Sequence, residues 1–156
     1  MVSRLSVRKR FVGLSEKDNS PTPTWFYNFI VNELGFIDVC RDPNEFNFMV
    51  DPLPEKSYCN PPFSEKSKFV KRACKEAKKG KLVVMLLPAD ISTQWFVEAH
   101  FRCNASVVLV AGGKVHSKRA LFPSMLLIFN GRREVHIVHI NQLRQFLKNY
   151  LLNDKP

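Results

Sequence analysis

The sequence lacks several features that would define its class at once. No apolar run approaches the roughly 18–20 residues that a membrane-spanning helix needs. The N-terminus is basic without an apolar stretch behind it, so we expect no secretory signal. Neither a GxGxxG turn nor a CxxC pair occurs. These absences exclude a membrane span within the sequence and argue against a zinc protein and an ordinary dinucleotide-binding turn.

The cysteines are few and widely separated. Cys40, Cys59, Cys74 and Cys103 have no neighbour at zinc-ligand spacing, and none of the histidines supplies one. A chain of 156 residues also buries enough core to fold without a disulfide framework or a structural metal. We therefore expect free thiols in a reducing compartment, a cytoplasmic location and no metal site.

Acidic residues are scarce relative to basic ones. The chain has 14 Asp and Glu against 24 Lys and Arg, which gives a net charge of +10 at pH 7. Such a charge favours a polyanionic partner, with nucleic acid first and a membrane surface second. Hydrophobic residues make up 45% of the chain, which indicates a folded globular domain.

Apolar runs alternate with helical periodicity after a basic leader at residues 1–20. Buried strands are predicted at Leu82 to Leu87, Ser106 to Ala111 and Ser124 to Phe129. A strand with one face exposed to solvent is predicted at Val135 to Ile140. Helices are predicted at 25–34, 64–79, 91–101 and 142–152. This alternation predicts an α/β fold for a single domain at 21–156, with a mostly parallel, helix-covered sheet. The Asn130-Gly131 turn predicts an antiparallel hairpin at one edge.

The tetrad Asn60-Pro61-Pro62-Phe63 lies between a predicted strand and a predicted helix, where open α/β sheets bind ligands. The Asn60 side-chain oxygen and the Pro61 carbonyl offer two acceptors for an exocyclic amine. The two prolines fix the backbone, so these acceptors are preorganised. Phe63 offers a face on which a base can stack. The alternative is a plain rigid turn.

Asp38 lies within a short predicted strand, Phe36 to Cys40. A carboxylate at a strand end accepts hydrogen bonds from the ribose or amino group of a ligand. A helix or loop cap is the alternative role.

The predicted helix after the tetrad has a basic face. Two interpretations stay open, contact with a phosphate backbone and a solvated surface. The basic residues of the leader and of a later loop, 114–119, would add to the same positive charge. The candidate nucleic-acid contacts are Lys68, Lys71, Arg72, Lys75, Lys114, Lys118 and Arg119.

Taken together, these stretches resemble the phage-type, Dam-like DNA N6-adenine methyltransferases. The matching stretches, over residues 21 to 131, are Pro21 to Pro23 with Trp25 and Phe26, Gly35 to Cys40, Tyr58 to Ser64, Val83 to Ala89 with Thr93, Trp95 and Phe96, and Ala120 to Ser124. The resemblance implies a Rossmann-like, S-adenosylmethionine-dependent fold and methyl transfer to N6 of adenine in DNA. It also implies a host-cell or virus-associated setting.

The resemblance assigns roles residue by residue. Asn60, Pro61 and Phe63, with Pro62 between them, would hold the target adenine. Thr22, Pro23, Asp38 and Cys40 would border the S-adenosylmethionine site. The chain departs from the family pattern at Arg41, where the family has alanine, at Lys114, where it has arginine, and in a short segment between Cys40 and Asn60.

Two other functions stay open. The first is a catalytically degenerate scaffold of this fold that serves as a basic nucleic-acid-binding or virion protein. The second is methyl transfer to RNA or to a protein amide, which NPPF chemistry permits. Oligomeric state and recognised DNA sequence do not follow from the sequence.

Overall fold

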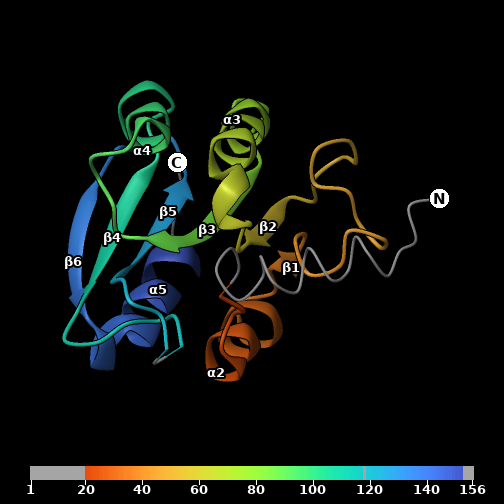
Figure 1. The fold of residues 1–156 in the computed structure, drawn as a ribbon. Helices are drawn as coiled ribbons and strands as arrows, with labels where there is room; N and C mark the ends of the chain where they lie inside the picture. Colours follow the sequence, from red (N-terminus) through yellow and green to blue (C-terminus); the bar gives the residue numbers. More distant parts are fainter. Residues whose placement is uncertain (1–19, 118, 153–156) are drawn as a thin grey trace.

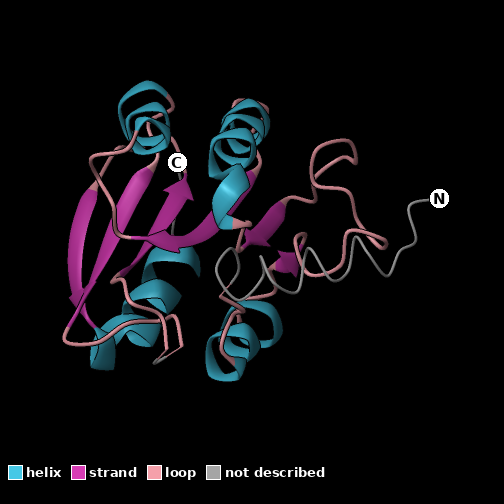
Figure 2. Cartoon of the chain, in the orientation of Figure 1, coloured by secondary structure: helices cyan, strands magenta, loops and turns pink. Residues whose placement is uncertain are grey.

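A six-stranded sheet with helices on both of its faces forms the centre of the structure (Figures 1 and 2). The computed structural model describes residues 20–117 and 119–152, so residues 1–19 of the basic leader, Lys118 and residues 153–156 lie outside the described residues. The strands are β1 (Ile37–Asp38), β2 (Lys56–Cys59), β3 (Leu82–Pro88), β4 (Ser106–Ala111), β5 (Ser124–Phe129) and β6 (Val135–His139).

The helices follow the predicted periodicity closely. One face of the sheet carries α3 (Lys66–Ala77), preceded by the turn η2 (Phe63–Glu65), together with α4 (Gln94–Val97) and η3 (Glu98–Arg102). The other face carries α2 (Thr24–Tyr27), η1 (Asn28–Glu33), η4 (Ile140–Gln142) and α5 (Leu143–Leu152). Gly80 follows α3 with φ +91°, a conformation that its missing side chain permits. The four predicted helical segments are therefore all present.

The strand order is β1-β2-β3-β5-β4-β6. Parallel pairing joins β1 to β2, β2 to β3 and β4 to β6, whereas β5 is antiparallel to both β3 and β4. The predicted edge hairpin is therefore wrong. Both edges of β5 are already occupied by β3 and β4, so the chain after the Asn130-Gly131 turn crosses over and adds β6 beside β4.

The continuous apolar strands are buried on both faces. In β3, Val83, Met85 and Leu87 pack into the core beneath α3 and α4, and Val84 and Leu86 pack into the core beneath α2 and α5. Strand β5 divides its side chains between the two cores in the same way. The two-sided burial explains why these segments show no polar alternation.

The expectation of free thiols is wrong. The four cysteines form two disulfides, Cys40–Cys59 with a Cα–Cα distance of 5.2 Å and Cys74–Cys103 with 5.6 Å. The first pair joins the ends of the adjacent strands β1 and β2, and the second joins α3 to the segment after η3. The paired cysteines are 19 and 29 residues apart in the sequence, so no local pattern predicted either pairing. Only the strand order and the helix packing bring the cysteines of each pair together.

Within residues 20–117 and 119–152, no helix is long and apolar enough to cross a membrane.

Candidate active site

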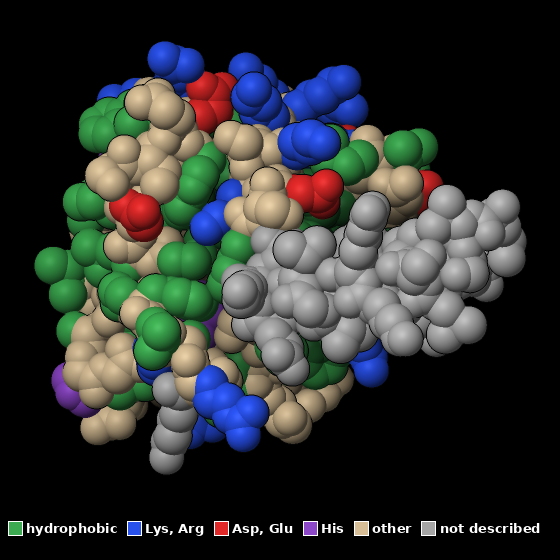
Figure 3. All heavy atoms as spheres, in the orientation of Figure 1, with side chains coloured by type: hydrophobic (Ala, Val, Ile, Leu, Met, Phe, Trp, Pro, Cys, Tyr) green, Lys and Arg blue, Asp and Glu red, His purple; other side chains and the backbone are tan. Residues whose placement is uncertain are grey.

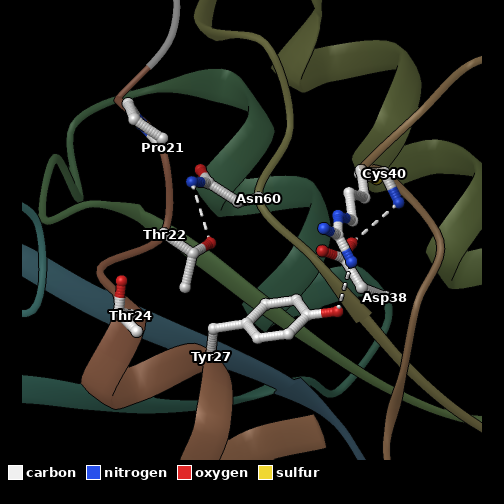
Figure 4. Close-up of a pocket in the computed structure, with 8 residues that line it drawn as sticks. Pro21, Thr22, Thr24, Tyr27, Asp38, Cys40 and Asn60 are labelled. Atoms are coloured by element: carbon white, nitrogen blue, oxygen red, sulfur yellow. Dashed lines mark hydrogen bonds between the residues drawn. The ribbon is translucent and has the colours of Figure 1, made fainter.

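A cavity of about 400 Å³ opens at the carboxyl ends of β1 and β2 (Figure 4). Asp38 of β1 pairs in register with Tyr58 of β2, and Asn60 follows two residues later. Parallel strands therefore bring two chemically active side chains, 22 positions apart in the sequence, to one edge of the sheet. The lining residues are Pro21, Thr22, Thr24, Tyr27, Asp38, Cys40, Arg41 and Asn60.

Asp38 provides the negative charge of this cavity. Its carboxylate accepts a hydrogen bond of 3.0 Å from the Cys40 amide. Burial raises the pKa of Asp38 above its usual value, although the Cys40 amide and the positive charge of Arg41 act in the opposite direction. A partly desolvated carboxylate of this kind favours a ligand that brings a cationic or N–H group to it.

Tyr27 and Arg41 line the same cavity and were not predicted as site residues. The Arg41 guanidinium donates to the Tyr27 hydroxyl at 3.1 Å and lies 5.4 Å from its ring centroid. Figure 4 shows Tyr27 lying between the strand-end group around Asp38 and the segment around Thr22. The departure of Arg41 from the family pattern was the only sequence signal, and a tyrosine on a surface helix gave none.

The amide of Asn60 is held in one orientation. Its Nδ2 donates to the Ser20 carbonyl at 2.6 Å and to Thr22 Oγ1 at 3.3 Å. Because a carbonyl only accepts hydrogen bonds, the atom facing Ser20 must be nitrogen. The Oδ1 atom is buried and has no hydrogen-bond partner among the described residues. An unpaired buried acceptor costs roughly 1–3 kcal/mol, which a ligand N–H would offset.

Tyr58 helps to hold the Asn60 amide in this orientation. Its side chain is fully buried, and its hydroxyl lies 2.8 Å from Thr22 Oγ1. Burial raises the pKa of Tyr58, so its phenol stays protonated and able to donate. It therefore helps to fix Thr22, which in turn binds Asn60. The sequence did not single out Tyr58, because an aromatic residue in a buried strand reads as core.

The rest of the tetrad forms the start of the helix that follows. The Pro62 carbonyl accepts the Glu65 amide at 3.0 Å and closes η2, which leaves Pro61 as the candidate second acceptor. Phe63 is half-buried, with the Lys66 ammonium 4.8 Å from its ring centroid and the Phe122 ring at 5.1 Å.

Pro23 is not among the residues that line the cavity. Its carbonyl instead accepts the amides of Phe26 and Tyr27 at the start of α2.

The predicted basic contacts divide into two groups. Lys68, Lys71 and Lys75 are exposed on α3, where Figure 3 shows Lys and Arg side chains gathered. Arg72 is different, because it is largely buried and donates to Glu76 and to the Asp51 carbonyl.

In the later loop, Lys114 donates to the Ala120 carbonyl and Arg119 is exposed. Lys118 lies outside the described residues.

His116 contacts Phe63 of the tetrad and has a lowered pKa. Burial, with the charges of Lys114 and Lys66, lowers the pKa of His116 to about 4 from a usual 6.5. The His116 imidazole of the unfolded chain therefore becomes protonated below pH 6.5, whereas that of the folded chain becomes protonated only near pH 4. We expect stability to fall by about 3 kcal/mol as the pH drops through this window. Urea unfolding at pH 7 and pH 4 should show this loss, and H116M should reduce it; equal losses in both proteins would contradict the assignment.

The described residues contain no group of three or more His, Cys, Asp or Glu side chains placed to hold a metal ion.

An open α/β sheet with a polar cavity at the carboxyl ends of its parallel strands defines a ligand-binding α/β protein. The comparisons with known proteins identify its family. A family model described as DNA N-6-adenine-methyltransferase (Dam) matches residues 53–142, which is more than half of the chain. The chain belongs to this family.

A relative has been found in Escherichia phage T1. Its DNA N-6-adenine-methyltransferase is 44% identical over 52 residues, which are 33% of this chain and 21% of that protein. The chain thus matches about a fifth of the relative's length. The family match contains Asn60 and Phe63, whereas Thr22, Tyr27 and Asp38 lie before it.

Proposed function

We propose that this protein transfers a methyl group from S-adenosylmethionine to the N6 amine of adenine in DNA. The observation that carries the proposal is the unpartnered Oδ1 of Asn60, held at the edge of a cavity by two hydrogen bonds from its own amide nitrogen. An acceptor that is buried, oriented and unpaired suits an incoming N–H group. Family membership supports the same reaction.

The cavity suits the proposed donor. Its volume of about 400 Å³ falls within the usual range for ligand sites. Asp38 would bind the ammonium or ribose hydroxyls of the donor, and Arg41 on the same wall offers a cation for a carboxylate. Thr22 and Tyr27 would complete the binding site. A Rossmann-like relationship is also part of this proposal, supported by the parallel order of β1, β2 and β3.

The chemistry assigned to the protein is positioning. S-adenosylmethionine would supply an electrophilic methyl group on a sulfonium. Asn60 Oδ1 would accept one N6–H of adenine, and the Pro61 carbonyl would accept the other. Both acceptors would stabilise the positive charge that develops on N6 while the bond from N6 to the methyl group forms and the bond from sulfur to the methyl group breaks. The sulfur would keep that electron pair, so the donor would leave as S-adenosylhomocysteine, and one N6 proton would pass to solvent. Phe63 would hold the base after it leaves the DNA stack.

The exposed lysines of α3 would contact the phosphate backbone. We expect K68Q/K71Q to reduce the slope of log binding constant against log salt by about 1.8, because each lost phosphate contact on duplex DNA removes about 0.9. The control is R144Q/K148Q, which removes two exposed charges from α5 on the opposite face. Equal slopes for the two variants would exclude this face as the binding surface.

Labelled methyl transfer tests the activity itself. Wild-type protein should transfer label from S-adenosylmethionine to adenine-containing DNA and not to a matched DNA that lacks adenine. RNA and protein substrates serve as comparisons, since NPPF-type chemistry also suits other amines. If label appears only in RNA or only in protein, that molecule and not DNA is the substrate.

The second candidate is a basic, nucleic-acid-binding scaffold without transferase activity. The short segment between Cys40 and Asn60, now joined by the Cys40–Cys59 disulfide, favours it because little chain is left to close over a donor. Calorimetric titration with S-adenosylhomocysteine separates the two functions. Micromolar binding supports the enzyme, and the absence of heat at any concentration supports the scaffold.

A further inference from the structure

The imidazole of His116 is a second buried polar group with an unmatched atom. The residue is 3% exposed, and its Nδ1 lies 2.6 Å from Ser124 Oγ at the start of β5. Its Nε2 is buried and has no hydrogen-bond partner among the described residues. No role has been assigned to His116 in the site described above.

The hydrogen bonds around Ser124 fix the tautomer of His116. Ser124 Oγ accepts the backbone amides of Val115 at 2.9 Å and His116 at 3.0 Å. With both lone pairs used, the hydroxyl has only its hydrogen left for the imidazole. Nδ1 is therefore the acceptor, and Nε2 carries the proton. The low pKa of His116 keeps the ring neutral at pH 7.

The ring belongs to the wall behind the Asn60–Phe63 tetrad. His116 makes edge-type contacts with Phe63, at a centroid distance of 6.2 Å, and with Phe122 at 4.7 Å. Phe63 and Phe122 also contact each other at 5.1 Å, so the three rings form one cluster. An N–H group therefore lies beside the ring proposed to hold the target base.

One unpaired atom thus belongs to the tetrad, and the other belongs to an imidazole that contacts Phe63 of the same tetrad. Among the buried side-chain nitrogen and oxygen atoms of the described residues, only Asn60 Oδ1 and His116 Nε2 lack a partner. The first is an acceptor and the second a donor. Adenine presents the complementary pair, because its N6–H donor is flanked by the acceptors N1 and N7.

We propose that His116 reads the target base, with its Nε2–H donating to N1 or N7 of the adenine whose amine is bound by Asn60. This inference rests on the proposed function. It makes His116 a specificity-determining residue. Guanine and thymine carry an oxygen in place of the amine, so Asn60 Oδ1 would face another acceptor. Cytosine carries the same donor and acceptor pair, so its exclusion depends on size.

Deaza analogues provide the test. The target adenine of a DNA that the protein methylates is replaced by 1-deazaadenine or by 7-deazaadenine, which each lack one ring acceptor. The substitution H116M removes the donor at similar volume, and H116Q restores an N–H near the position of Nε2. Thermal unfolding of both variants verifies that they fold, and DNA affinity is measured beside kcat/KM.

We expect the loss in kcat/KM from H116M and the loss from one deaza analogue to be non-additive. Wild type should lose about tenfold to a hundredfold in kcat/KM on one analogue, the range expected when a buried hydrogen bond is left unmade. H116M should show a similar loss on ordinary adenine and no further loss on that analogue. H116Q should recover part of the activity on adenine alone. The analogue that shows the coupling identifies N1 or N7.

Several results would overturn the inference. If wild type is indifferent to both analogues, His116 is a packing residue only. The same conclusion follows if the losses from H116M and from the analogue multiply as independent effects. Failure of the proposed function and failure of the role of His116 give different results. Absence of transfer to ordinary adenine removes the function and this role together, whereas transfer without coupling removes the role of His116 alone.

Discussion

Replacing Asn60 with alanine should reduce the rate of methyl transfer by about 10²- to 10³-fold, the range found when one preorganised group is removed from a transition state. The substitution deletes the unpartnered Oδ1 and also the two N–H donors that hold Ser20 and Thr22. Single-turnover kinetics measure the loss directly. Affinities for S-adenosylhomocysteine and for DNA, measured in parallel, separate lost chemistry from lost binding.

Asn32 offers a matched control for this change. Among the described residues, its exposed amide binds only the Asn28 side chain on η1, so N32A removes the same chemical groups away from the cavity. We expect N32A to keep the wild-type rate. A correctly folded N60A protein with an unchanged rate constant would show that Asn60 does not act on the reacting amine.

Removing either disulfide should lower the free energy of unfolding by about 3 kcal/mol, because each cross-link restricts a loop of similar length in the unfolded chain. The two double variants are C40A/C59A and C74A/C103A. They are expected to match in stability and to differ in ligand binding. Cys40 lines the cavity and Cys59 precedes Asn60, whereas Cys74 and Cys103 lie outside the lining.

Urea unfolding and titration with S-adenosylhomocysteine measure the two effects separately. Wild type that has been reduced while unfolded keeps its sulfur atoms and loses both cross-links, which isolates their contribution from that of side-chain volume. Its stability should fall by more than that of either variant. Equal stability of oxidised and reduced wild type would show that the cysteines do not act as cross-links.

The sequence by itself determined the local structure and the chemistry of the tetrad. Apolar runs such as 82–87 and 124–129 become strands because their side chains are buried on both faces, and the helical segments follow from period and from glycine ends. Asn60 to Pro62 lie between β2 and η2 and Phe63 begins η2, as the position of the motif between a strand and a helix predicted. Proline restricts its own backbone, so this part of the structure needs no distant contact.

The tertiary structure decided which distant groups meet. The hairpin prediction failed because β3 and β4 both pair with β5, a fact of the whole sheet that no local turn records. The disulfides, the bonds of Asn60 to Ser20 and Thr22, and the placement of His116 behind Phe63 depend on the same strand order. Periodicity reports burial along one segment, but contacts between segments depend on the arrangement of all strands together. This arrangement holds the Asn60 amide in place and brings His116 into contact with Phe63.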